Sequence, residues 1–325
     1  MSKIFLRLAR FGVALAFFVV TVGAWVRLTD AGLGCPDWPG CYGQVVVPDS
    51  HADAAAGVDD YAQRPLEVGK AWREMIHRYL ASTLGLVCVA LAGLALANRR
   101  DPDQPLAVPL VLVGLVIFQG LLGMWTVTLL LKPIIVVSHL LGGLATLALL
   151  ASLARLRPRS VVAGASELRT LGLAAAAALV VQITLGGWTS ANYAALACPD
   201  FPTCQTQWWP RIADFEEGFV LWRGLGVDYE GGVLEHPARV AIHFTHRLGA
   251  VVATILIGVL GWLLARRQAA RADGLAVLGL LLLQLALGVG IVVFGVPISL
   301  AVAHNGAAAL LLLAVINANQ RIRQR

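Results

Sequence analysis

Apolar residues in this chain come in eight long blocks, separated by short polar and charged stretches. About 20 apolar residues in a helix are enough to cross a hydrocarbon core of about 30 Å. The blocks predict spanning helices over residues 11–27, 74–98, 106–128, 135–154, 170–189, 241–265, 274–294 and 299–318. The first block follows basic residues, as in a signal peptide, but no small-residue cleavage site follows it, so we expect a retained helix.

The composition agrees with this pattern. The chain is 58% apolar and only 14% charged, with a mean hydropathy of +0.75, whereas about a quarter of the residues in a soluble domain are charged. A soluble enzyme, a disordered chain and a coiled coil are thereby excluded. The net charge of +6 does not indicate a nucleic-acid partner, because the basic residues form short clusters between apolar blocks. We expect an all-α integral membrane protein whose surroundings are the lipid bilayer.

The basic clusters also predict the orientation. They fall on one side of the eight-span pattern, which holds few acids. The positive-inside rule places that side, with both termini, in the cytoplasm, in the cell (inner) membrane. The two long loops, 28–73 and 190–240, then lie outside. The clusters contain Lys3, Arg7, Arg10, Arg99, Arg100, Arg155, Arg157, Arg159, Arg169, Arg266, Arg267, Arg271, Arg321, Arg323 and Arg325.

The two halves of the chain repeat one another. Cys35-Pro-Asp-Trp-Pro-Gly-Cys41 matches Cys198-Pro-Asp-Phe-Pro-Thr-Cys204, and His77-Arg78 matches His246-Arg247 at nearly the same separation. Gln119 and His139 likewise match Gln284 and His304. Each half holds four spans and so inserts the same way round. We expect two pseudo-symmetric four-helix bundles, residues 1–160 and 161–325, related by an axis along the membrane normal.

Each outer loop carries one close cysteine pair, Cys35/Cys41 and Cys198/Cys204. In an oxidising exterior such pairs are disulfides or dithiols that cycle. The fifth cysteine, Cys88, stands alone in the second span, where we expect it to be buried as a packing residue.

Four of the seven histidines fall in the even-numbered spans: His77, His139, His246 and His304. Ionisable groups inside a membrane are costly and point to function. Each lies within the first one or two turns from the outer side, so all four share one level near the outer face. Two neutral imidazoles on facing helices suit haem iron, whereas zinc would lack further ligands. The alternative without a ligand is hydrogen bonding to neighbouring helices.

The halves differ at one position of this pattern. Glu74 stands three residues before His77, on the same helix face, and the second half has His243 at that place. A partly desolvated carboxyl beside a haem can move protons; the alternative for Glu74 is an ion pair with a neighbouring arginine. His243 is expected to support the site or lie at the interface, with iron ligation as its alternative.

Arg78 and Arg247 directly follow two of the candidate ligands. Both are suited to pairing with haem propionates, and contact with lipid headgroups is the alternative. His51 and His236, in the outer loops, are expected to be solvated.

Together these features resemble the haem A synthase family of cytochrome oxidase assembly proteins (the CtaA or Cox-fifteen type). The resemblance rests on the eight spans in two halves, the four histidines, the Glu74-x-x-His77 start of span two and the Cys-Pro-Asp-aromatic-Pro-x-Cys loops. It implies oxidation of a ring methyl of haem O to a formyl group, giving haem A for the terminal oxidase. It also implies disulfide formation in the two cysteine loops.

The resemblance further implies a division of labour. His246 and His304 would hold a permanent haem b, while His77 and His139 bind the substrate haem O and Glu74 is the functional carboxylate. The implied partners are a haem O synthase as haem donor and a membrane electron donor such as quinol, with homo-oligomerisation left open.

Three other classes of protein remain as alternatives. A b-type cytochrome passing electrons from quinol to an outer partner explains the histidines but not the Glu74/His243 difference. A transporter with histidine proton relays does not explain why the polar residues gather at the outer ends of unbroken spans. A disulfide-handling oxidoreductase leaves the histidines unexplained.

Overall fold

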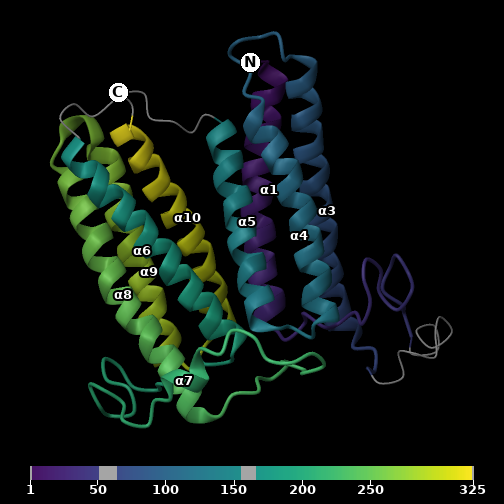
Figure 1. The fold of residues 1–325 in the computed structure, drawn as a ribbon, viewed down its shortest axis with the longest axis vertical. Coiled ribbons are helices and arrows are strands. Elements are labelled where there is room, and N and C mark those ends of the chain that lie inside the picture. The colour runs from purple at the N-terminus through teal and green to yellow at the C-terminus, as the bar shows by residue number, and fades with distance from the viewer. Residues whose placement is uncertain (1, 51–63, 155–165, 324–325) are drawn as a thin grey trace. The chain divides into compact units, whose positions relative to one another are not determined.

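The computed structural model describes residues 2–50, 64–154 and 166–323, so His51 lies outside the described part. Within these ranges the chain is helical and contains no strand, only two isolated bridges in the cysteine loops. Eight helices are long (Figure 1): α1 (Lys3–Leu28), α3 (Val68–Ala97), α4 (Ala107–Thr128), α5 (Pro133–Leu153), α6 (Ser166–Ala191), α8 (His236–Ala265), α9 (Arg271–Val293) and α10 (Ile298–Arg323). A short helix, α7 (Phe215–Gly218), lies in the segment that joins α6 to α8.

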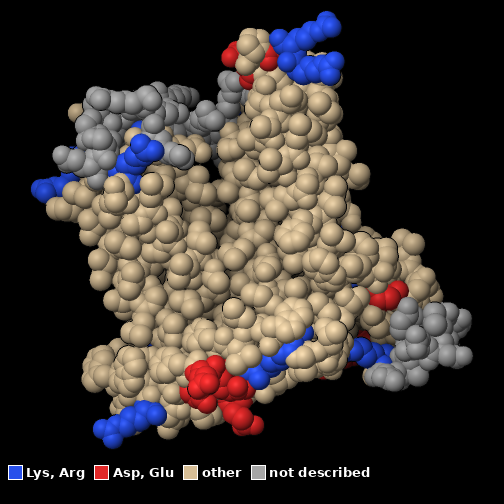
Figure 2. Space-filling model, viewed as in Figure 1, with Lys and Arg blue, Asp and Glu red and all other residues tan. Residues whose placement is uncertain are grey.

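All eight long helices are long and apolar enough to cross a membrane, which confirms the predicted multi-pass membrane protein. Charged side chains gather toward the helix ends and are absent from the middle of the face drawn in Figure 2. Large apolar side chains such as Leu86, Ile117 and Val251 are exposed on the helix surfaces. An apolar exterior is what a lipid environment requires.

Several helices begin earlier than their apolar blocks, and two of them, α3 and α8, do so at the end that carries the cysteine loops. α3 begins at Val68 and not at 74, and α8 begins at His236 and not at 241. Hydropathy marks only the apolar part of a helix, whereas these two continue through a polar turn at the end that carries the cysteine loops. His77 and His246 therefore lie about 14 Å along their helices, further than the one or two turns predicted.

The chain divides into two compact units, Met1–Ala154 with Leu221–Val233, and Arg155–Val220 with Leu234–Arg325. In the first unit, α1 contacts α3 and α5, and α4 contacts the same two helices, which closes a ring of four. In the second unit, α6, α8, α9 and α10 contact one another in the same cyclic order.

Residues 221–233, here called the strap, follow the second cysteine loop in sequence but pack on the first unit. Lys132, only 2% exposed, donates from Nζ to the carbonyls of Arg223 (2.8 Å) and Gly224 (3.0 Å) and lies 3.8 Å from the Trp222 ring centre. Tyr229 of the strap is buried in an apolar cluster with Leu33, Val127 and Leu131. A lysine in an apolar turn between two spans thus anchors a distant part of the sequence.

We expect Lys132→Met to release the strap. Hydrogen bonds to a charged group contribute about 1.5–3 kcal/mol, so the detached form should become about 10- to 100-fold more populated. Trypsin cleavage after Arg223 should accelerate accordingly. Arg64→Gln is the matched control: it removes only the part-exposed ion pairs to Asp228 and Glu230, which contribute at most about 1 kcal/mol. Equal cleavage rates in the two variants would contradict the anchoring role of Lys132.

Candidate functional site

His77 on α3 and His139 on α5 face each other inside the first unit. Their ring centroids are 6.4 Å apart with an interplanar angle of 84°, and the Nδ1 atom of each ring is enclosed without a hydrogen-bond partner. Gly23 on α1 makes this approach possible, since a Cβ there would lie 2.9 Å from Cε1 of His77. The predicted pair is therefore brought together by helices that are distant in sequence.

This separation fits two imidazoles that share one metal ion. Rings bound on opposite sides of a metal through bonds of about 2 Å have centres about 6 Å apart. The described residues contain no group of three or more His, Cys, Asp or Glu side chains that could hold a metal ion. The donor set thus suits iron whose remaining ligands come from a macrocycle, rather than a closed zinc site.

In the second unit, His246 on α8 and His304 on α10 each contact a glutamine amide. Nε2 of Gln182 lies 3.1 Å from Nδ1 of His246, and Nε2 of Gln284 lies 3.1 Å from Nε2 of His304. Ligation through Nε2 of His304 requires Gln284 to move aside. Glycines again lie beside both rings, since a Cβ at Gly186 or Gly288 would lie 3.1 or 3.2 Å from the nearer Cε1.

Glu74 is buried at the loop end of α3, where it holds the first cysteine loop. Its Oε2 accepts the backbone N–H of Cys35 (2.9 Å), and its Oε1 accepts Nη2 of Arg78 (2.5 Å). Arg78 also donates from Nη1 to the carbonyls of Asp37 and Gly40. Glu74 and Arg78 therefore form one clamp on the Cys35–Cys41 loop.

The second unit holds its loop in the same manner with a different residue. His243 is buried; its Nδ1 lies 3.3 Å from the backbone N of Cys198, and its Nε2 lies 3.3 Å from Nε of Arg247. A neutral imidazole accepts a hydrogen bond at only one of these two nitrogens. The other guanidinium nitrogens of Arg247 donate to the carbonyls of Cys198, Asp200 and Thr203. His243 thus replaces Glu74 as the link between helix and loop, and both its ring nitrogens have a polar neighbour.

An aspartate side chain in each cysteine loop accepts hydrogen bonds from backbone N–H groups of the same loop. Asp37 accepts the backbone N–H groups of Tyr42 and Gly43. In the second loop, burial alone would raise the pKa of Asp200, but hydrogen bonds from Thr203 and two backbone N–H groups hold that pKa below its usual value. The carboxylate therefore stays ionised at neutral pH. Both cysteine pairs are disulfides, Cys35–Cys41 and Cys198–Cys204, and Cys88 is free and buried.

The structure changes the picture for the two arginines. Arg78 and Arg247 were predicted to pair with haem propionates. In the structure, both side chains donate hydrogen bonds to backbone carbonyls of the cysteine loops. Propionate binding by either arginine stays a prediction. Gln182 could not be predicted from the repeat, because its counterpart in the first half is Val19. The two aspartates could have been found, since both follow Cys-Pro in the repeated motif.

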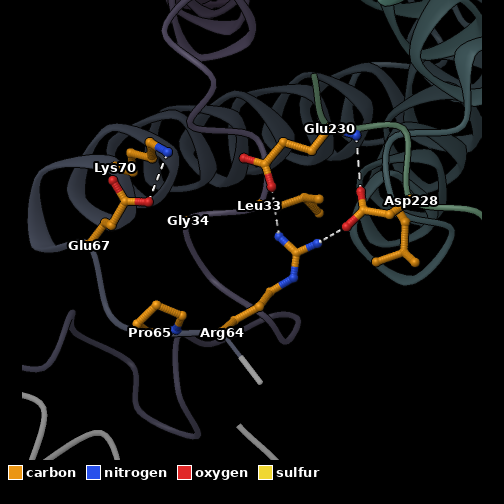
Figure 3. A pocket seen from close by; sticks show the side chains of 9 residues that line it. Leu33, Gly34, Arg64, Pro65, Glu67, Lys70, Asp228 and Glu230 are labelled. Carbon is orange, nitrogen blue, oxygen red and sulfur yellow. Dashed lines mark hydrogen bonds and ion pairs between the residues drawn. The ribbon is translucent and has the colours of Figure 1, made fainter. Parts of the chain in front are cut away.

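A separate pocket of about 460 Å³ lies at the loop end of the first unit (Figure 3). Its charged side chains already pair with one another: Arg64 with Asp228 and Glu230, and Lys70 with Glu67. The paired imidazoles, and not this pocket, are therefore the candidate functional site.

Comparisons with known proteins show the family of this chain. A sequence model of a family described as Cytochrome oxidase assembly protein (COX15-CtaA) matches residues 7–316. A protein of Shewanella oneidensis named Heme A synthase is 44% identical over 96% of this chain and 94% of its own length. Proteins of the same name from Rhizorhabdus wittichii and Caulobacter vibrioides are each 30% identical, over 93% and 96% of this chain and 89% and 94% of their own lengths. The chain belongs to the COX15-CtaA family of cytochrome oxidase assembly proteins.

Proposed function

We propose that this chain is a haem A synthase, which oxidises a ring methyl group of haem O to the formyl group of haem A. The observation that carries the proposal is the pair of facing imidazoles of His77 and His139, with the carboxylate of Glu74 three residues from one of them. Relatives along nearly the whole chain carry the name Heme A synthase.

The first unit is assigned to the substrate. Iron held between imidazoles supplies the redox chemistry that no side chain provides. His77 and His139 bind and orient the substrate macrocycle, and the apolar walls of the helix ring exclude water from it. Glu74 accepts a proton at Oε1 or Oε2, being the carboxylate on the helix face of His77.

The second unit is assigned to a resident haem b, held by His246 and His304, which passes electrons from a membrane donor such as quinol. The repeated motifs support an arrangement of two related four-helix bundles, 1–160 and 161–325, with both termini cytoplasmic. The haem sites then lie near the outer face of the inner membrane, and a haem O synthase delivers the substrate.

Pigment extraction from the purified full-length protein tests the function. Cells that supply haem O should yield protein carrying haem B together with haem O and haem A. Protein with haem B alone, at two equivalents per chain, would favour the electron-relay cytochrome. Protein with no tetrapyrrole would refute both readings.

A further inference from the structure

Two arginines near the candidate ligands have no anionic partner among residues 2–50, 64–154 and 166–323. Arg73 on α3 is half-buried and lies with its guanidinium carbon 5.7 Å from the Trp25 ring centre. In the part of the chain that the structure describes, its side chain makes no hydrogen bond or ion pair. Arg239 on α8 has an enclosed Nε without a hydrogen-bond partner. A partly desolvated guanidinium without an anion is costly, and an aromatic contact compensates only in part.

The positions of these arginines relate them to the histidines. Arg73 stands four residues before His77, on the same helix face and about 6 Å toward the loop end. Arg239 stands seven residues before His246, again on one face and about 10 Å toward the loop end. Each cation therefore lies beyond a candidate iron ligand, in the direction of the loops.

The neighbouring arginines do not compete for this role. The guanidinium groups of Arg78 and Arg247 already donate hydrogen bonds to carbonyls of the cysteine loops. The counterpart of Arg73 in the second unit is Ile242, which is fully buried. Each unit thus has one such arginine, at a different position of the repeat: the first-unit counterpart of Arg239 is Lys70, which pairs with Glu67.

We infer that Arg73 binds a carboxylate of the tetrapyrrole in the first unit, and that Arg239 does so in the second. This inference rests on the proposed function, because haem carries two propionate groups at one edge of its ring. Guanidinium pairs well with carboxylate through two parallel hydrogen bonds. A lipid phosphate offers similar chemistry, so the experiment must separate the two sources.

The test is an absorbance titration of the full-length protein in detergent, purified from cells that make haem B but not haem O. The probes are ferric haem B and its dimethyl ester, in which both propionates are blocked. Arg73→Ile copies the second unit, and Arg99→Ile, at an exposed position just beyond the far end of α3, is the control for charge. Loss of a charge-assisted contact should weaken binding of the free acid about 10- to 100-fold, and leave the ester unaffected. Arg73→Lys should recover part of the loss.

Different results of this titration would overturn carboxylate binding by Arg73 and the proposed haem A synthase function. The inference is overturned if Arg73→Ile and Arg99→Ile bind the free acid with equal affinity. It is also overturned if Arg73→Ile loses affinity for the acid and for the ester equally, because that result indicates that Arg73 acts by packing against Trp25. A loss confined to the free acid identifies the propionates, and not a lipid phosphate, as the anion that Arg73 binds, because the ester differs from the acid only in its blocked carboxylates. Wild-type protein that binds neither probe and carries no haem refutes the proposed function itself. For the second unit, Arg239→Leu should speed loss of the resident haem to a haem-free acceptor protein.

Discussion

Glu74→His is expected to keep the first cysteine loop in place and to reduce haem A formation at least about 100-fold, the usual loss when a general acid–base group is removed. The second unit supplies the reason for this choice of residue. There His243 takes the place of Glu74 and contacts the same two kinds of group, a cysteine backbone N–H and an arginine guanidinium. The substitution therefore removes the carboxylate while preserving the clamp, and the ratio of haem A to haem O in extracted pigment measures the effect.

Glu74→Ala serves as the comparison. It leaves the Cys35 N–H and the Arg78 guanidinium without their buried partner, which should cost about 1–3 kcal/mol and loosen the loop. The Cys35–Cys41 disulfide of the Glu74→Ala variant should then react faster with a small reductant than the same disulfide in the Glu74→His variant. His243→Glu, the reverse exchange, should retain haem B and haem A formation. Normal haem A formation in Glu74→His would show that Glu74 only holds the loop.

The sequence was sufficient for the features that follow from repetition and hydropathy. Eight helices, the two disulfide pairs and the His77–His139 pair could all be predicted, because apolar length and repeated motifs report them directly. The starts of α3 and α8 could not, since both helices continue through residues as polar as Lys70 and Arg73. A hydropathy pattern marks the apolar part of a helix and does not mark the polar turns with which the helix begins.

Contacts that join distant, unrepeated segments were not predictable. The strap has no counterpart in the first outer loop, so nothing in the repeat indicated that Lys132 would bind the carbonyls of Arg223 and Gly224. The same limit applies to Arg78 and Arg247. Their sequence position favours a ligand or a headgroup, and only the folded loop shows that both arginines also donate to backbone carbonyls of the cysteine loops.

His246→Ala is expected to deplete the resident haem b and, with it, haem A formation, while haem O still binds in the first unit. Mutation of groups that merely orient a metal ligand weakens binding about 10- to 100-fold, so loss of the ligand itself should exceed 100-fold. His304→Ala should have the same effect. His77→Ala and His139→Ala should instead spare haem B and lose haem O, because each unit forms its own ring of helices.

The four variants together test the assignment of ligands to units. Extraction and low-temperature spectra of each purified variant give the amount of each pigment and the ligation state of its iron. Paired imidazoles predict that the His246 and His304 variants lose haem B and that the His77 and His139 variants lose haem O. An unchanged low-spin spectrum in His246→Ala would mean that another side chain holds the iron, and His243 is the nearest candidate in sequence. Its ring is already engaged by Cys198 and Arg247, so taking over as the ligand would release the second cysteine loop, which faster reduction of its disulfide would reveal.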